Sequence, residues 1–407
     1  MGKVFNIRSG ECILKAAFLV LLFQFLSSPS PLYSMEKDSS YGNSYQNRYF
    51  EFGGDNQEDI KRFSVSYNRT EGLFIGFGIP RRYDNYRRRS NLAFYGFAGY
   101  GFASDEWRYK AGLSRRFFRD RFIEIGIEGY SLTETEDEWI IPAYENSLSA
   151  FLLHEDFYDF YERVGYTLYL KNRLNRYIYL HMGYFEDDQK NMAVNTAYSV
   201  FRKGKTFRPI PEIREGMMKS LFLTLRSSRR HYFRGWLVYF NIILNEDGFF
   251  SDNFDDFSRY IIDVRRYQPF GFEDMLNLRL RIGFSRGKLP PQYKFDLGGI
   301  STLRGFRYKE FSDGEKMVLG NVEYRLNPVD ISGLSDILFF NPFMLVIFAD
   351  AGFIWSGEER IPGLSELKKD VGIALANSDD SFRLNFAKAI SDKERKIIVT
   401  FRINSPF

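Results

Sequence analysis

Long apolar runs are scarce in this chain. After residue 34 no stretch reaches the roughly 20 apolar residues that a membrane-spanning helix needs, which excludes a helical membrane protein. Tryptophan and histidine are also rare, at 4 and 3 residues, and the mean hydropathy is -0.34. The chain is nevertheless rich in other aromatic residues, with 27 Tyr and 43 Phe among 407 residues. This aromatic content is unusual for a soluble domain of polar mean hydropathy.

Cysteine is limited to Cys12, which precedes the first apolar run. Three basic residues lie within residues 1–15, residues 16–26 read AAFLVLLFQFL, and residues 27–34 read SSPSPLYS. This order predicts a secretory signal peptide over residues 1–34 rather than an uncleaved anchor. The exported chain then holds no cysteine, so no disulfide framework supports it.

Net charge is small as well. Lys and Arg number 56 against 52 Asp and Glu, a formal charge of +4, and the two signs are spread almost evenly. This balance argues against nucleic acid as a partner. High aromatic content with polar hydropathy is typical of a membrane β-barrel, because each strand presents an apolar face to lipid and a polar face to the lumen.

Alternation of period two supports the barrel interpretation. In MLNLRLRIGF, residues 275–284, Leu and Ile fall on one face while Asn277, Arg279 and Arg281 fall on the other. Residues 317–326 and 396–407 alternate in the same way, which indicates strands with one apolar side. A soluble β-sandwich is the alternative, but it rarely supplies so many long strands with arginines repeatedly on the second face.

The same template predicts an all-β, transmembrane outer-membrane β-barrel of about 16 antiparallel strands over residues 62–407, preceded by a short polar segment at 35–61. The predicted strands are centred on residues 62–69, 72–79, 91–102, 106–116, 121–131, 162–171, 176–185, 218–227, 234–244, 257–267, 274–285, 316–326, 343–354, 370–377, 382–389 and 396–404.

The connectors alternate between short and long. Short basic turns such as residues 117–121 are expected on the periplasmic side, and the long segments 132–161, 186–217 and 286–315 are expected to be outer loops. Short helices are expected within these connectors, near 144–154, and also near 363–369.

Three short motifs follow one another in the last third of the chain. They are LRGF at residues 303–306, GNVE at 320–323 and FADAG at 348–352, and the chain then ends on Phe407. The succession resembles the C-terminal barrel signature of the bacterial surface antigen superfamily, which includes the BamA-like assembly factors and the two-partner secretion transporters. Leu303 stands where that signature has Val or Ile. The motif residues that the resemblance implies are Leu303, Arg304, Gly305, Phe306, Gly320, Glu323, Phe348, Asp350, Gly352 and Phe407.

Strand parity supplies a physical reason for the three motifs. Glu323 and Asp350 both fall on the polar side of their strands. An inward-folded loop can bring Arg304 to them, and a guanidinium group can bind a carboxylate through two parallel hydrogen bonds. Glycines 298, 299 and 305 permit the tight backbone that this loop needs. The resemblance implies that Asp350 is the main partner of Arg304; the alternative is a solvated loop arginine.

The function that the resemblance implies is insertion or translocation of a protein, or of a lipid, at the outer membrane of a Gram-negative bacterium. Larger relatives carry periplasmic repeat domains, and only residues 35–61 would be left for them, so the chain resembles the barrel-only members. The expected partners are outer-membrane lipid, a protein or lipid client and, during biogenesis, the barrel-assembly machinery, which commonly reads a terminal aromatic such as Phe407. The alternative function is a passive pore or a structural surface protein.

Enzymatic activity has weak support in the sequence. His154, Glu155 and Asp156 form an HED cluster in a long connector, but His181 and His231 lie outside any hydrolase or metalloprotease motif. We therefore expect no catalysis, no metal and no cofactor. The basic cluster RRYDNYRRR, residues 81–89, is expected to be a periplasmic turn that faces anionic headgroups.

Overall fold

A computed structural model describes residues 60–81, 92–118, 123–175, 177–202, 204–231, 234–245, 254–270, 274–326, 343–357, 363, 365–377, 382–391 and 394–403. The expected signal peptide, most of the segment at 35–61, most of the basic cluster at 81–89 and Phe407 lie outside these residues. The predictions made for them therefore stay predictions.

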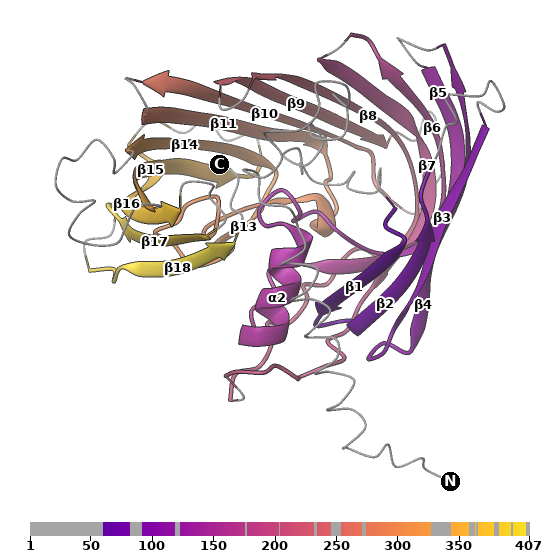
Figure 1. The fold of residues 1–407 in the computed structure, drawn as a ribbon, viewed down its shortest axis with the longest axis horizontal. Coiled ribbons are helices and arrows are strands. Elements are labelled where there is room, and N and C mark those ends of the chain that lie inside the picture. The colour runs from indigo at the N-terminus through magenta and orange to yellow at the C-terminus, as the bar shows by residue number, and fades with distance from the viewer. Residues whose placement is uncertain are drawn as a thin grey trace. The chain divides into compact units, whose positions relative to one another are not determined.

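Sixteen strands form one antiparallel sheet in which each strand pairs with the next along the chain (Figure 1). Their bounds are β1 (Phe63–Asn68), β2 (Gly72–Ile79), β3 (Leu92–Gly101), β4 (Glu106–Phe117), β5 (Ile123–Thr135), β6 (Phe160–Arg173), β7 (Ile178–Asn191), β8 (Gly216–His231), β9 (Arg234–Asn245), β10 (Phe257–Phe270), β11 (Asp274–Gly287), β14 (Lys316–Leu326), β15 (Phe343–Trp355), β16 (Lys368–Asn377), β17 (Phe382–Ala389) and β18 (Ile398–Ile403). Each coincides with a predicted segment, so the all-β class and the strand number are confirmed. Several strands, β7 and β8 among them, run further than predicted.

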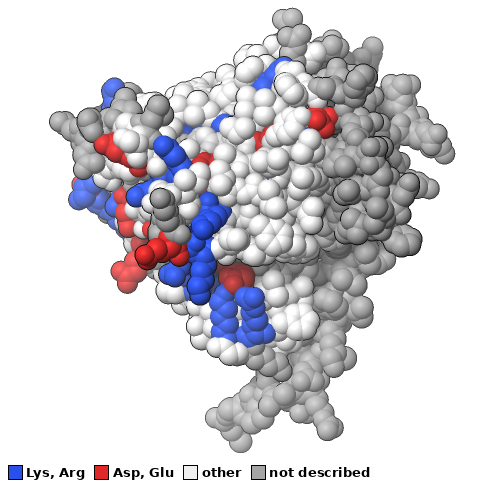
Figure 2. All heavy atoms as spheres, turned by 90° about the vertical axis from the view of Figure 1, so that its left-hand side faces the viewer, with Lys and Arg blue, Asp and Glu red and all other residues white. Residues whose placement is uncertain are grey.

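The strands bury their charged side chains and expose their apolar ones, the reverse of a strand in a soluble protein. On β11, Arg279 and Arg281 are buried while Leu278 and Leu280 are exposed. On β14, Glu323 is 1% exposed and its neighbour Val322 is 43% exposed. On the side of the molecule that Figure 2 shows, a broad area of uncharged residues lies beside a region where Lys, Arg, Asp and Glu gather. The face of the sheet that presents apolar side chains is therefore suited to lipid.

Helices are few among the described residues, and one of the two that were expected is present. Helix α2 (Ala143–Leu153) lies in the connector between β5 and β6, as predicted near 144–154. The helix expected near 363–369 is wrong, because β16 already begins at Lys368 and the described residues before it make only a turn, in which Glu366 N donates to Gly363 O at 3.0 Å. No helix among the described residues is long and apolar enough to cross a membrane.

The chain divides into two compact units, and each is described by itself. The first comprises Met1–Leu113, Gly129–Arg163 and Asn191–Pro211, and the second comprises Ser114–Glu128, Val164–Lys190 and Glu212–Phe407. In the first unit α2 lies against β1, where the rings of Phe151 and Tyr67 meet edge to face with centroids 5.2 Å apart (Figure 1). The second unit holds all three motifs.

Candidate functional site

The loop between β11 and β14, residues 288–315, carries the first motif and has structure of its own. A 3-10 turn at Pro291–Tyr293 leads into β12 (Phe295–Leu297), which pairs with β13 (Phe311–Gly314) in a separate two-stranded sheet. This short sheet was not expected from the sequence. It closes the stem of the loop, so residues 298–310 form a compact tip.

Two glycines turn the chain at the start of the tip. Gly298 and Gly299 have φ of +121° and +82°, values that L-residues with a side chain rarely adopt. The turn is closed by two hydrogen bonds, from Gly299 N to Leu303 O at 2.8 Å and from Gly298 N to Thr302 Oγ1 at 3.0 Å. Leu303 is fully buried. These contacts fix the backbone from which Arg304 projects.

The Arg304 side chain binds two carboxylates on the polar face of the sheet. Its Nε and Nη2 donate to the two oxygens of Asp350, each at 2.7 Å, and its Nη1 donates to Glu323. Asn321 Nδ2 also donates to Asp350, at 2.8 Å, and the Phe348 ring lies 3.7 Å from the guanidinium carbon. The predicted pair with Asp350 is confirmed in geometry, and the interpretation of Arg304 as a solvated arginine is wrong.

Burial and charge act on Arg304 in opposite directions. Burial alone lowers the pKa of the guanidinium, but the attraction of Asp350 and then of Glu323 outweighs it, and the net shift of the pKa is upward. The two carboxylates therefore favour the charged form of Arg304 although the side chain is buried.

Glu323 extends the network to β17. Arg383 donates from Nη2 and Nη1 to the two Glu323 oxygens at 2.7 and 3.1 Å, and Arg325 donates at 3.2 Å. Glu323 thus accepts from three arginines. Sequence analysis missed Arg383; its only sequence signal is a position on the polar side of an alternating segment, which many arginines share.

A second charged cluster lies on the neighbouring strands β10 and β11. Asp263 is fully buried and accepts hydrogen bonds from Arg279 at 2.6 Å, Arg281 at 2.9 Å and Arg265 at 3.4 Å. Arg279 also reaches the loop tip, donating to Ser301 O at 3.4 Å. The second cluster is therefore linked to the loop.

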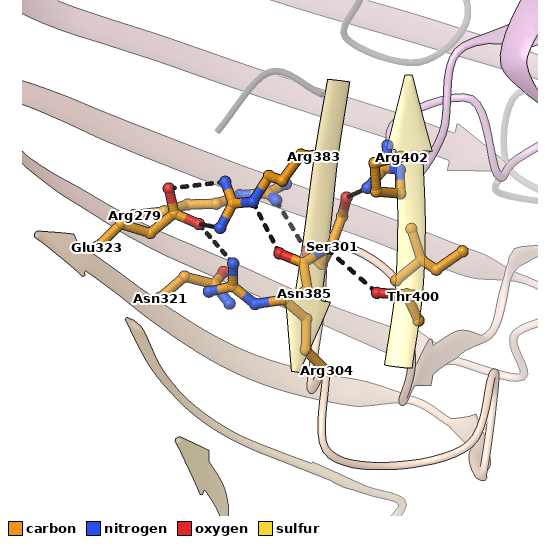
Figure 3. Close-up of a pocket in the computed structure, with 10 residues that line it drawn as sticks. Arg279, Ser301, Arg304, Asn321, Glu323, Arg383, Asn385, Thr400 and Arg402 are labelled. Carbon is orange, nitrogen blue, oxygen red and sulfur yellow. Dashed lines mark hydrogen bonds and ion pairs between the residues drawn. The ribbon is translucent and has the colours of Figure 1, made fainter. Parts of the chain in front are cut away.

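A small polar cavity of about 30 Å³ remains beside the loop tip (Figure 3). It is lined by Arg279, Ile300, Ser301, Arg304, Asn321, Glu323, Arg383, Asn385, Thr400 and Arg402. Arg402 Nη1 donates to Ser301 Oγ at 2.6 Å, so β18 also holds the tip. The space is enough for a water molecule, and Asn321 Oδ1, buried and without a hydrogen-bond partner within the described residues, lies at its wall.

The motif glycines have different roles. Gly305 does not have a positive φ; instead, a Cβ there would lie 2.6 Å from Asp370 Cβ and 2.7 Å from Ala389 N. The expectation that Gly305 serves backbone conformation is therefore corrected, because its role is close approach. A Cβ at Gly352 would lie 3.0 Å from Leu297 Cδ1 of the loop, whereas the nearest atoms to a Cβ at Gly320 are 3.9 Å away. The structure does not explain the glycine at 320.

The outer end of the tip has a contact of its own. Phe306 is buried against Phe311, with ring centroids 5.2 Å apart, and the Arg395 guanidinium lies 4.9 Å from its ring. Arg395, in the β17–β18 connector, donates two hydrogen bonds to the Glu310 carboxylate at 2.6 and 2.8 Å. This pair lowers the pKa of Glu310, first through the Arg395 hydrogen bonds.

The HED cluster has separate partners rather than a shared site. His154 ends α2 and contacts Ala197 O through Nε2 at 2.7 Å, Glu155 pairs with Lys205, and Asp156 is buried against Arg69. Over the described part of the chain no group of three or more His, Cys, Asp or Glu residues could hold a metal ion.

Comparison with known proteins agrees with this geometry. Residues 227–405 match the Omp85 superfamily domain, and residues 34–219 match the C-terminal domain of a family of unknown function, DUF5686. The chain is 26% identical over 150 residues to outer membrane protein assembly factor BamA of Nitratidesulfovibrio vulgaris; the match covers 33% of this chain and 17% of that protein.

One solved structure shows a similar fold beyond the motif region. BamA from Haemophilus ducreyi lacking POTRA domains 1–3 superposes with a TM-score of 0.53 at 16% identity, over 84% of this chain and 69% of that one. CdiB from Acinetobacter baumannii gives a TM-score of 0.42 at 13% identity, over 84% and 59%. With the inverted polarity of the strands and the anchored loop, the match over residues 227–405 identifies a BamA-like β-barrel domain of the Omp85 superfamily in this part of the chain, and it indicates the outer membrane of Gram-negative bacteria as the location.

Proposed function

We propose that this barrel inserts or translocates protein at the outer membrane, with loop 288–315 as an internal brace. The observation that supports the proposal most directly is the contact of one loop arginine, Arg304, with carboxylates on two adjacent strands, β14 and β15. The relative that this chain matches over 150 residues is an outer membrane protein assembly factor.

The brace ties the loop to the last strands of the sheet. Its contacts include Arg279 on β11, Glu323 on β14, Asp350 on β15 and Arg402 on β18. We propose that this holds the C-terminal part of the sheet in one register while a client is handled. The proposed partners are outer-membrane lipid, a protein or lipid client and the assembly machinery that inserts the barrel itself, and we propose that the protein has no catalytic activity.

A reconstitution experiment tests the function. The purified protein is placed in liposomes, a urea-denatured outer-membrane barrel protein is added, and folding is followed by its shift in gel mobility before boiling. We expect faster folding than in empty liposomes, and slower folding when the reconstituted protein carries Arg304→Ala.

The alternative makes a different prediction in the same preparation. A passive pore would leave the folding rate equal to that in empty liposomes while giving steady conductance in planar bilayers, and this result would overturn the proposal. Liposomes that contain an unrelated barrel at the same density control for bilayer defects.

A further inference from the structure

Strand β1 lies at one end of the described strand order, so one of its edges does not pair with a neighbour in that order. The edge that does pair is identified by its hydrogen bonds, since Gly78 N on β2 donates to Arg62 O. The backbone N–H and C=O groups of successive residues point alternately to the two edges of an antiparallel strand. The backbone groups of Arg62 and of the even-numbered residues after it therefore point to β2. Val65, Tyr67 and Arg69 therefore direct their backbone groups to the other edge.

Two connectors of the same unit already occupy the far end of that edge. Tyr67 N donates to Ser147 Oγ on α2 at 2.6 Å, and Arg69 N donates to Asp156 Oδ2 at 2.8 Å. Arg69 O accepts a hydrogen bond from Asn195 N at 2.9 Å. Unpaired backbone groups of this kind allow an edge strand to take up a further strand. Here three of them are satisfied by atoms that belong to no strand.

Side chains bury the same end of β1. Arg69 is fully buried, and its guanidinium donates to Asp156 O at 2.8 Å and to Asp159 Oδ1 at 3.1 Å. The Tyr67 hydroxyl donates to Tyr198 O at 2.7 Å. An incoming backbone could not reach Tyr67 or Arg69 while these contacts are made.

We propose that Ser147, Asp156 and Asn195 form an edge latch, which must withdraw before an extended polypeptide can pair with β1 beyond Val65. The partner is recognised by its backbone, as in β-strand addition. A latch made of a few hydrogen bonds is reversible, because each such bond contributes only modestly to net stability. The inference that the latch gates a client rests on the proposed function. The inference that the latch is closed in the free protein does not.

The first measurement is hydrogen exchange at single amides of the full-length protein in lipid nanodiscs. We expect slow exchange at Tyr67 and Arg69 in the wild type. Ser147→Ala with Asp156→Ala should speed exchange at both amides at least about fivefold, as expected for the loss of one net hydrogen bond, and leave Ser66 unchanged. Ser149→Ala, on the same helix but outside the latch, is the matched control.

The second measurement uses a labelled peptide with the sequence of residues 396–407, KIIVTFRINSPF, which includes the strand at the other end of the described order. We expect it to bind the double variant at least about fivefold more tightly than the wild type, because the competing contacts are gone. Gel mobility before boiling shows whether each variant is folded. If the double variant does not fold, Ser147→Ala alone should speed exchange at Tyr67 and not at Arg69.

Two results would overturn the latch. One is wild-type exchange at Tyr67 and Arg69 as fast as in an unstructured peptide. The other is equal peptide binding by the wild type and the double variant although exchange has increased. Both measurements could support the latch while the barrel fails to accelerate client folding. That result would refute the proposed function and leave the latch standing.

Discussion

Arg383 and Glu323 face each other through a paired contact in which both guanidinium Nη atoms donate to the two carboxylate oxygens, at 2.7 and 3.1 Å. They lie 60 residues apart, on β17 and β14. Since Glu323 also accepts from Arg304, the anchored loop is coupled to a strand that carries none of the three motifs.

Removing either partner of the central pair should release the loop. Arg304→Ala or Asp350→Ala leaves a partly desolvated charge, which typically costs about 3 to 5 kcal/mol when one member of a buried pair is lost. Limited proteolysis within residues 298–310 should become faster in both. Because the two residues act as one unit, the double variant should be little worse than either single variant.

The control for this series is Arg307→Ala, which removes an exposed arginine from the same tip. Its proteolysis should match that of the wild type. Fully additive effects in the double variant, or a loop as protected in Arg304→Ala as in the wild type, would refute the coupling.

Arg383→Ala should weaken the anchoring of the loop although the substituted residue lies outside the loop. The variant leaves Glu323 with fewer donors, so its contact with Arg304 should loosen and proteolysis of the tip should rise, by less than in Arg304→Ala. Arg383→Lys should recover only part of the effect, because an ammonium cannot bind both carboxylate oxygens through a planar pair of donors. Equal protection of the tip from protease in the wild type, Arg383→Ala and Arg383→Lys would show that Arg383 does not position Glu323.

Gly305→Ala should displace the tip, because the added methyl group would overlap with neighbouring atoms. Its Cβ would meet Asp370 Cβ and Ala389 N at 2.6 and 2.7 Å, and the second of these is backbone that cannot rotate away. Overpacking of this kind costs about 1 to 3 kcal/mol. Thermal unfolding followed by gel mobility measures the loss, and Gly320→Ala, where a Cβ finds room, is the control that should unfold like the wild type.

Acid should loosen the outer contact of the tip, between Glu310 and Arg395. The folded-state pKa of Glu310 is lowered by Arg395, so this pair contributes stability that is fully present above the unfolded value, about 4.3, and is lost as the pH falls through the folded value. Proteolysis near residue 310 should therefore rise below about pH 4. Glu310→Gln should show the raised rate already at pH 7, and an identical pH profile in the two proteins would contradict the assignment.

The apolar outer side of β11 should not accept charge. Leu280 is 47% exposed, and an arginine at a lipid-facing position near the bilayer centre costs about 2 to 4 kcal/mol. Leu280→Arg should reduce the yield of folded barrel in liposomes, whereas Ser312→Arg, at an exposed loop position, should not. Equal yields would mean that this side of the strand does not meet lipid.

The sheet was predictable because its signal is local. Alternation along ten residues identifies a strand and its polar side, and Glu323 and Asp350 lie on that side as expected. The pair with Arg304 needed the family resemblance as well, since parity places many arginines inside. Strands β12 and β13 are too short to show a period, and the helix expected at 363–369 fails because a strand begins within it. The contacts of α2 with β1 join residues about 80 apart, which no local pattern encodes.

The wide spacing of the loop's partners has a consequence for the order of assembly. The tip at 298–310 is held by Glu323, Asp350 and Arg402, and Arg383 in turn holds Glu323. All four residues lie after the tip in the sequence, on strands β14, β15, β17 and β18. Its contacts can close only after the strands of these four residues have formed. Docking of the loop is therefore a late folding event, and a docked loop reports that the C-terminal end of the chain is in place.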